Sequence, residues 1–277
     1  MVSPVVCQVG LGRGVVHQWH DLVGIESCPI NSPVLNRSLA SLIEMSKKKR
    51  FPRFLREIEF FTNETDVQIN VMQTERPLAK MFFEKCSEAI KGFSPTNALD
   101  YPVGDWTYRV GSRSFFQVNR FLIERVTQVA VAGASGGTAM DLYSGVGLFT
   151  LPLAQAFKQV TAVDASSPST RDLSFNLERA GLDAQVINTP VADYLAGIQE
   201  APDFVVAAPP RAGLGAPVTE HLLRLSPSQL VLVSCDPATL ARDLAALTAG
   251  GYAIQSVSLL DLFPQTFHME TIVKLTR

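Results

Sequence analysis

The residues best placed to do chemistry in this sequence are a cysteine and a glutamate. Cys235 follows an apolar strand and precedes a predicted helix in which Asp236 is the N-cap and Pro237 the first residue. Because the positive end of a helix dipole favours a thiolate, we expect a lowered pKa and a candidate nucleophile; a buried structural thiol is the alternative. Glu270 stands at the start of the predicted strand Thr271–Leu275, where it could face the same cleft as Cys235; a solvated strand-end glutamate is the alternative.

A glycine turn predicts a nucleotide-like cofactor. Asp141–Ala154 follows a strand and opens a helix, and Gly145 and Gly147 permit a tight turn and a close backbone approach. Asp164 ends the next strand, where a carboxylate can bind ribose hydroxyls. The third glycine of the dinucleotide fingerprint is missing, which favours S-adenosylmethionine over a nicotinamide cofactor. A purely structural strand-to-helix turn is the alternative.

The elements that must position these residues alternate between strand and helix. The fold class expected is α/β: a Rossmann-like, doubly wound, mostly parallel sheet over residues 96–277, preceded by a small α+β domain over residues 1–95. The polar stretch Gly92–Asp100 is the expected boundary. The predicted strands of the larger domain are Ala139–Tyr143, Gln159–Asp164, Gln185–Asn188, Asp203–Ala207, Leu230–Ser234, Ile254–Leu259 and Thr271–Leu275, with a helix over Pro168–Ala180.

In the smaller domain we expect strands over Glu57–Phe61 and Asp66–Val71 and one helix over Pro77–Lys91. The apolar face of that helix is predicted to hold Leu78, Met81, Phe82, Cys86 and Ile90. A basic cluster precedes them and could bind phosphates, although such runs are often only solvated faces. The cluster consists of Lys47, Lys48, Lys49, Arg50, Arg53 and Arg56.

Composition narrows the class of protein. The 277 residues are 47% hydrophobic and 18% charged, which indicates a globular chain, and the net charge of -2 argues against a protein held on nucleic acid by its overall charge. No apolar run is long enough for a membrane span and no secretory signal is visible, so a cytoplasmic location is expected. The four cysteines are scattered, which predicts reduced thiols.

Five motifs in one order resemble the S-adenosylmethionine-dependent RNA uracil-5 methyltransferase family. They cover about residues 100 to 277, and several are absent from ordinary methyltransferases. The segments are Ser114–Asn119 (SFFQVN), the turn after Asp141, Pro209–Gly213 (PPRAG), Ser234–Pro237 (SCDP) and Phe263–Glu270 (FPQTFHME).

The resemblance implies roles for individual residues. Cys235 would be the nucleophile and Glu270 the base, while the cofactor would contact Gln117, Tyr143 and Asp164 beside the glycines Gly145 and Gly147. Uracil C5 reacts poorly with a sulfonium methyl group, so a thiolate first adds at C6. A carboxylate must later remove the C5 proton before the thiol can leave.

The implied substrate is RNA, and the small domain over residues 1–95 would be the central, RNA-contacting domain of the family. The target base would be single-stranded or flipped out, because a duplex hides C5 and C6. Phe116 is a candidate for stacking on the base and Arg211 for shaping its pocket; core packing and a structural salt bridge are the respective alternatives. Phe115, Phe263 and Phe267 also lie in the relevant motifs. His268 is interpreted as a turn residue rather than a metal ligand, because no second histidine stands at ligand spacing.

Two departures from the family pattern bear on function. Ala208 replaces the aspartate that usually precedes Pro-Pro-Arg, which removes a polar contact and allows an alternative: a catalytically impaired RNA- or cofactor-binding relic. The Ile25–Pro33 segment around Cys28 is similar to the ribosomal RNA branch, so rRNA is favoured over tRNA.

That branch binds an iron-sulfur cluster, but its upstream cysteines and N-terminal barrel are missing here. We therefore expect an N-terminally shortened chain without an iron-sulfur cluster, because such a cluster needs four ligands and Cys7 alone cannot supply the rest. A monomer is expected. A small-molecule methyltransferase or a nicotinamide enzyme is a third possibility.

Overall fold

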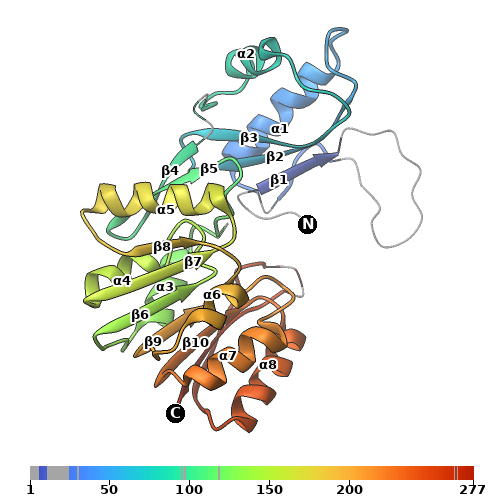
Figure 1. Ribbon diagram of the computed structural model, residues 1–277. Helices are drawn as coiled ribbons and strands as arrows, with labels where there is room; N and C mark the ends of the chain where they lie inside the picture. Colours follow the sequence, from blue (N-terminus) through green and yellow to red (C-terminus); the bar gives the residue numbers. More distant parts are fainter. Residues whose placement is uncertain are drawn as a thin grey trace. The chain divides into compact units, whose positions relative to one another are not determined.

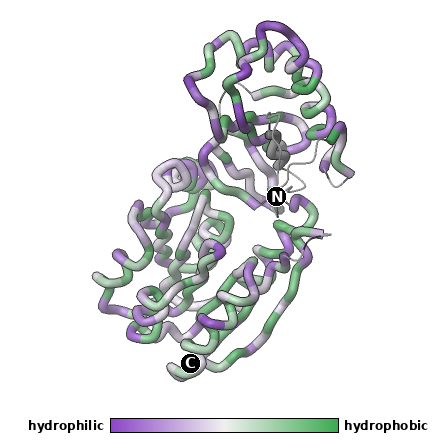
Figure 2. The backbone as a smooth tube through the Cα atoms, turned by 90° about the vertical axis from the view of Figure 1, so that its right-hand side faces the viewer, coloured by the Kyte–Doolittle hydropathy of each residue, from purple (hydrophilic) through white to green (hydrophobic). Residues whose placement is uncertain are grey.

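The computed structural model describes residues 6–10 (backbone only), 25–29, 31–94, 96, 98–117, 119–264, 266 and 268–277. Contacts divide the chain into two compact units, the first comprising residues 1–101 and 111–113 and the second residues 102–110 and 114–277. Each unit has its own apolar core, and Figure 2 shows hydrophobic stretches in both. The units are therefore described separately.

The first unit is built on an antiparallel sheet with two helices. Strands β1 (Val6–Gly10), β2 (Leu55–Thr62) and β3 (Val67–Thr74) pair in that order. Helix α1 (Pro33–Ser46) packs against β2 and β3, and it also contacts α2 (Lys80–Ala89). Apolar side chains of both helices and two strands form the core, including Leu35, Leu42, Ile58, Phe60 and Phe82. The result is the small α+β arrangement expected from sequence.

Two details of this unit differ from the prediction. Helix α2 begins at Lys80 rather than Pro77, after Ala79, which provides no side-chain cap. Met81 is 51% exposed, so its predicted place on the apolar face is wrong, whereas Phe82, Cys86 and Ile90 are buried. The buried face repeats every four residues, and a residue directly before Phe82 points elsewhere.

The second unit is a seven-stranded sheet, which confirms the expected α/β class (Figure 1). Its strand order is β11-β12-β10-β9-β6-β7-β8. Strands β10, β9, β6, β7 and β8 run parallel, and β12 runs antiparallel to both β10 and β11. Their bounds are β6 Thr138–Leu142, β7 Gln159–Asp164, β8 Gln185–Asn188, β9 Phe204–Ala207, β10 Gln229–Ser234, β11 Ala253–Leu260 and β12 Glu270–Thr276. A separate pair, β4 (Ala98–Val103) and β5 (Trp106–Gly111), lies where the chain passes between the units.

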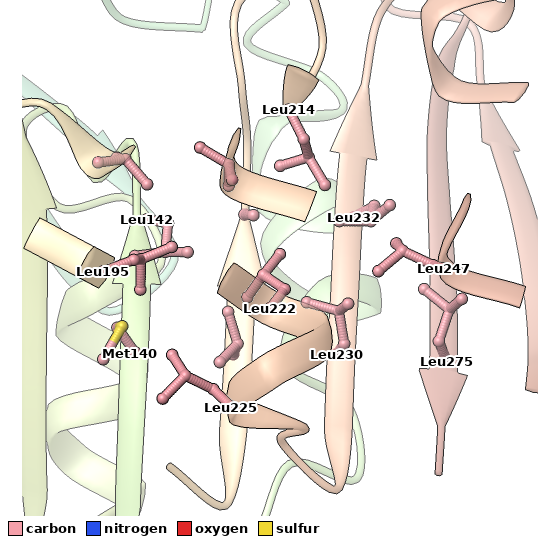
Figure 3. Close-up of a cluster of buried hydrophobic side chains, with 14 of the residues drawn as sticks. Met140, Leu142, Leu195, Leu214, Leu222, Leu225, Leu230, Leu232, Leu247 and Leu275 are labelled. Carbon is pink, nitrogen blue, oxygen red and sulfur yellow. The ribbon is translucent and has the colours of Figure 1, made fainter. Parts of the chain in front are cut away.

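Helices cover both faces of the large sheet. On one face, leucines of α6 (Val191–Gly197), α7 (Gly215–Leu225) and α8 (Pro237–Ala249) interlock with strand residues, as Figure 3 shows for Leu195, Leu222 and Leu247. On the other face, α4 (Thr150–Ala156) and α5 (Ser167–Ala180) pack against β7, and α3 (Ile123–Val131) packs against β12. The inner strands are consequently buried on both sides, β9 over its whole length.

Helix starts in this unit follow the local sequence. Ser166 and Asp236 cap α5 and α8 by accepting hydrogen bonds from the N–H groups of Ser169 and Thr239. The predicted Asp236–Pro237 start is thus confirmed, and it places Cys235 immediately before a helix. None of the helices in the described part of the chain is both long and apolar enough to cross a membrane.

Candidate active site

The carboxyl edge of the parallel strands gathers the residues predicted to carry function. Leu142 of β6 pairs in register with Ala207 of β9, which in turn pairs with Leu232 of β10. The residues that follow these strands therefore emerge along one edge: Tyr143 after β6, Ala208 after β9 and Cys235 after β10. Asp164 ends β7 at the same edge. Open α/β sheets bind ligands at this edge.

The antiparallel strand β12 brings Glu270 to Cys235. Ser234, the last residue of β10, pairs with Thr271, so the residues one step further, Cys235 and Glu270, are neighbours across the two strands. The charge of Glu270 raises the pKa of the Cys235 thiol, which places the two groups within electrostatic reach. An acid and a thiol thus face one another at the mouth of the sheet.

The expected lowering of the Cys235 pKa is wrong. Burial raises it first and the Glu270 carboxylate second, while Arg211, through its charge and a hydrogen bond to the sulfur, lowers it. The thiol is half-buried, so the loss of solvation outweighs the helix N-terminus that the sequence emphasised. Arg211 therefore favours a thiolate here, and an ionised Glu270 opposes it.

Glu270 is buried and incompletely bonded. Its side chain is 3% exposed, and Oε2 has no hydrogen-bond partner among the described residues. Burial raises the pKa of this carboxyl to about 7. A buried carboxyl that exchanges a proton near neutrality is suited to general acid–base work.

Arg211 is held beside the thiol by His268. An Arg211 Nη2 lies 3.3 Å from His268 Nε2. Guanidinium nitrogen can only donate, so Nε2 accepts and the imidazole proton resides on Nδ1. Burial and the charge of Arg211 lower the His268 pKa, which keeps the ring in this neutral form. Within the described residues no group of His, Cys, Asp and Glu could hold a metal ion.

The glycine turn, Tyr143–Gly147, has a backbone that ordinary residues avoid. Tyr143, Gly145 and Gly147 have φ angles of 62°, 55° and 99°. A side chain at Gly147 would meet Leu173 at 2.3 Å, whereas one at Gly145 would meet nothing within 4 Å. Gly147 is thus required by packing, and Gly145 leaves open space beside the backbone.

Two carboxylates fix the glycine turn. Asp164 accepts hydrogen bonds from the N–H groups of Gly145 (2.8 Å) and Ser166 (2.7 Å). Each of its oxygens keeps a second lone pair for a hydroxyl. Asp141 is fully buried and accepts from Thr150 Oγ1 at 2.6 Å, and burial raises its pKa to about 7.

Buried polar atoms of this turn and of the SFFQVN segment lack partners. Gln117 Oε1, Ser144 Oγ and Asp141 Oδ1 have none within the described parts of the chain. Native proteins seldom leave such atoms unbonded, so their presence together with the open space at Gly145 fits a bound polar ligand such as a nucleoside. Ser144 and Asp141 were not among the predicted contacts, although both lie in the motif that pointed to the turn.

The aromatic candidates lie in different surroundings. Phe116 is 5% exposed and packs on Tyr108 with ring centroids 5.6 Å apart, so its ring belongs to the core. Phe115 is 73% exposed. Phe263 is partly buried and packs edge-on against His268, and Phe267 lies outside the described residues. Of the SFFQVN phenylalanines, only Phe115 presents a free face to solvent.

Distant motifs are tied together at this edge. Asn119 Nδ2 of the SFFQVN segment donates to Leu262 O, directly before the FPQTFHME segment, at 3.1 Å. Thr239 Oγ1, in the first turn of α8, donates to Arg211 O at 3.0 Å. Asp243 accepts from Leu214 N and from Arg242. Asn119, Thr239 and Asp243 therefore support the loops that carry the reactive groups, a role that sequence spacing does not reveal.

Ala208 and Cys28 occupy structural surroundings. The Ala208 N–H donates to Leu142 O, and its methyl group offers no acceptor at the edge. Cys28 is buried in the first unit, where its backbone exchanges two hydrogen bonds with the Asn36 side chain. The side chain of Cys7 lies outside the described residues.

Known proteins resemble this chain over the same region. The family model described as tRNA (Uracil-5-)-methyltransferase matches residues 96–277. An "Uncharacterized RNA methyltransferase" of Aquifex aeolicus is 38% identical over 62% of this chain and 41% of its own length. The "23S rRNA (uracil(1939)-C(5))-methyltransferase RlmD" of Aeromonas hydrophila is 29% identical over 98% of this chain and 66% of its own length. The chain thus spans between two fifths and two thirds of these relatives.

A solved structure shares the fold. The Pyrococcus abyssi tRNA (uracil-54, C5)-methyltransferase, determined in complex with S-adenosyl-L-homocysteine, superposes with a TM-score of 0.76 at 23% identity, covering 99% of this chain and 76% of that one. The family model covers well over half of the sequence and includes every residue at the carboxyl edge described above. This chain belongs to the tRNA (uracil-5-)-methyltransferase family.

Proposed function

We propose that this protein transfers a methyl group from S-adenosylmethionine to C5 of a uridine in RNA. The observation that carries the proposal is the meeting of Cys235 and Glu270 across β10 and β12, with the Glu270 carboxyl buried at a pKa of about 7. A thiol and a proton-exchanging carboxyl at one ligand edge are what uracil C5 alkylation requires. Family membership supports the same reaction.

The methyl donor would be held at the glycine turn. Open space at Gly145, the Asp164 carboxylate and the unpartnered Oε1 of Gln117 suit a nucleoside with hydroxyl and amino groups. Tyr143 and Gly147 shape the backbone around it. The bound donor supplies an electrophilic methyl group, and the relative from Pyrococcus abyssi was determined with the demethylated form of such a donor.

The reaction would begin with the sulfur of Cys235. The thiol first gives its proton to solvent; the resulting thiolate adds to C6 of uracil, and the electron pair of the C5–C6 double bond moves toward the O4 carbonyl as an enolate. Arg211 stabilises the thiolate by its charge, and His268 fixes the Arg211 guanidinium. C5 of the enolate then takes the methyl group, so that the methyl–sulfur bond of the donor breaks and a neutral thioether is left, and C5 retains its proton.

Glu270 would complete the cycle. Its carboxylate accepts the C5 proton, the C5–C6 double bond reforms and the C6–S bond breaks, which returns the thiolate. Burial raises the basicity of the carboxylate above that of an exposed glutamate, as its pKa of about 7 shows. The proton is afterwards released to solvent.

An RNA of the ribosomal type is the preferred substrate within this proposal. The Cys28 segment and the relative from Aeromonas hydrophila favour rRNA over tRNA, and the cytoplasm is the proposed location. Phe115, exposed beside Phe116, is the better placed of the two for stacking on a flipped base. The proposed oligomeric state is a monomer.

One observation favours a second function. Ala208 presents a methyl group where the family usually has an aspartate, and losing such a polar contact costs about 1–3 kcal/mol. A chain that binds the donor and RNA without turnover is the alternative that this change supports.

A trapping experiment separates the two functions. RNA containing 5-fluorouridine carries fluorine at C5, so the proton step cannot occur and the covalent protein–RNA adduct accumulates after methyl transfer. With labelled donor, we expect a labelled adduct that survives denaturation and is absent in Cys235→Ala. Binding of the donor without an adduct would support the alternative, a chain that binds donor and RNA without turnover. Cys86→Ala is the control, because burial raises the pKa of that thiol to about 12 and it should not form an adduct.

A further inference from the structure

A groove of about 860 Å³ lies in the first unit, on elements that the proposed chemistry does not use. It is formed by the end of α1, the turn leading into β2, the end of β3 and helix α2. We call it the basic groove. Its basic lining residues are Lys48, Lys49, Arg50, Arg53, Arg76 and Lys85.

The charge of the basic groove is strongly positive. Six basic residues and two acidic ones line it, an excess of four positive charges in a protein whose net charge is -2. Glu75 is engaged by Arg56 in an ion pair. Across the described residues, Lys48, Lys49, Arg50 and Arg53 are exposed and take part in no ion pair or side-chain hydrogen bond. Their charges are available to an anion.

The basic groove also offers flat and apolar surface. The guanidinium of Arg76 stacks over the Phe54 ring at 4.1 Å from its centroid. Met81 on α2 is 51% exposed, whereas Phe51 and Phe82, which also line the groove, are buried. A volume in the range of organic ligand sites, roughly 300–1,000 Å³, accommodates a short segment of a polymer rather than a single ion.

We propose that the basic groove binds single-stranded RNA, with phosphates on Lys48, Lys49, Arg50 and Arg53 and a base against the Phe54–Arg76 stack. The inference rests on the proposed function and adds a second place where the RNA is held. Cations that follow a backbone beside an aromatic or guanidinium plane are the means by which proteins bind single strands. An acidic peptide would also pair with the basic side chains, but it has no base to stack on Phe54 and Arg76.

Fluorescence anisotropy with a labelled oligoadenylate tests the basic groove in the full chain. This probe contains no uridine, so Cys235 chemistry does not enter the measurement. In Lys49→Gln/Arg53→Gln we expect affinity to fall about tenfold, and the slope of log affinity against log salt to fall by roughly 1.4, because each phosphate contact to a single strand contributes about 0.7. Phe54→Ala should weaken binding about 5- to 100-fold without changing the slope.

The matched control is Arg37→Gln/Lys91→Gln. Both residues are exposed in the same unit, outside the groove, and the double variant loses the same charge. It should keep the wild-type salt slope. Unchanged far-UV circular dichroism identifies the variants that are folded.

Two results would overturn the inference. The first is a Lys49→Gln/Arg53→Gln protein that binds RNA with the affinity and salt slope of the Arg37→Gln/Lys91→Gln control. The second is an oligoglutamate peptide that displaces the RNA as effectively as unlabelled oligoadenylate at equal charge. Failure of the proposed function would give a different result. The wild-type chain would bind oligoadenylate through the groove but form no adduct with 5-fluorouridine RNA, which would support the inference and contradict the proposed catalysis.

Discussion

The glycine turn and the Cys235–Glu270 pair lie at one edge of the same sheet but differ in how fully their carboxyl groups are bonded. At the turn, the Asp164 carboxylate is bonded to two backbone N–H groups, and the Asp141 carboxyl accepts from Thr150, although its Oδ1 has no partner among the described residues. At the pair, Glu270 Oε2 is buried without a partner, and the neighbouring thiol is made less acidic by burial and by Glu270.

This difference teaches how one edge can serve two purposes. The turn has a rigid shape whose stability comes from its own hydrogen bonds, which suits recognition of an unchanging ligand. The pair holds groups that gain from changing their protonation state, which suits chemistry and reduces stability. Substitutions at the turn should therefore affect folding, and substitutions at the pair should affect turnover.

The largest effect is expected for Glu270→Gln. Methyl transfer turnover to uridine RNA should fall by about 10²–10⁴-fold, because no group then removes the C5 proton. The covalent adduct should accumulate even with ordinary uridine. Quantifying adduct on denaturing gels and turnover with labelled donor checks this. The control is Glu220→Gln, which changes an exposed glutamate on α7. If the turnover of Glu270→Gln lay within tenfold of wild type, another group would have to remove the proton.

Gly147→Ala tests the turn through stability. We expect a loss of about 2–4 kcal/mol of unfolding free energy, because the new methyl group meets Leu173 and φ is 99°. Gly145→Ala has open space and φ of 55°, so it should lose only about 1–2 kcal/mol. Urea denaturation of both variants provides the comparison. Equal losses would show that the Leu173 contact relaxes easily.

The pair should reveal itself in the pH dependence of stability. The pKa of Glu270 is raised from 4.5 to about 7, so the folded state binds more protons between these values and stability falls as pH rises through that window. Glu270→Gln removes this component. Between pH 4 and pH 8, the unfolding free energy of wild type should therefore fall by about 1–3 kcal/mol more than that of Glu270→Gln. Urea denaturation at both pH values measures it. Asp141 contributes in the same direction in both proteins.

The smallest effect concerns Arg211. Its charge lowers the pKa of Cys235, so Arg211→Gln should slow alkylation of that thiol by iodoacetamide at neutral pH by about three- to tenfold. The rate assigned to Cys235 is the difference from Cys235→Ala. Arg171→Gln on α5 controls for the loss of one charge. A rate unchanged by Arg211→Gln would mean that His268 does not hold the guanidinium near the sulfur.

Much of the fold follows from local pattern. The strands β7 and β8 have the predicted bounds, because each holds β-branched apolar residues between polar ends. Asp236 and Pro237 mark a helix start without tertiary information. Helix α1 was not among the predicted elements, although Ser32 and Pro33 precede Leu35, Leu39 and Leu42 at helical spacing.

Other features depend on partners that the sequence does not name. Strand periodicity does not tell that β12 inserts between β10 and β11, and this insertion is what sets Glu270 beside Cys235. The pKa of the Cys235 thiol shifts in the opposite direction from the prediction, because burial is a property of the whole fold. The interior position of Phe116, which lies outside any strand, likewise depends on Tyr108 of β5.

The six residue pairs between β10 and β12 have a consequence for fluctuations of the native state. Central ladders of this kind open only when most of a domain opens, whereas loops open locally at little cost. Cys235 and Glu270 are each one residue away from that ladder, so the distance between them should be preserved when the surrounding loops open locally. Amide hydrogen exchange in Leu232 and Val273 should accordingly be among the slowest in the protein, close to the catalytic atoms.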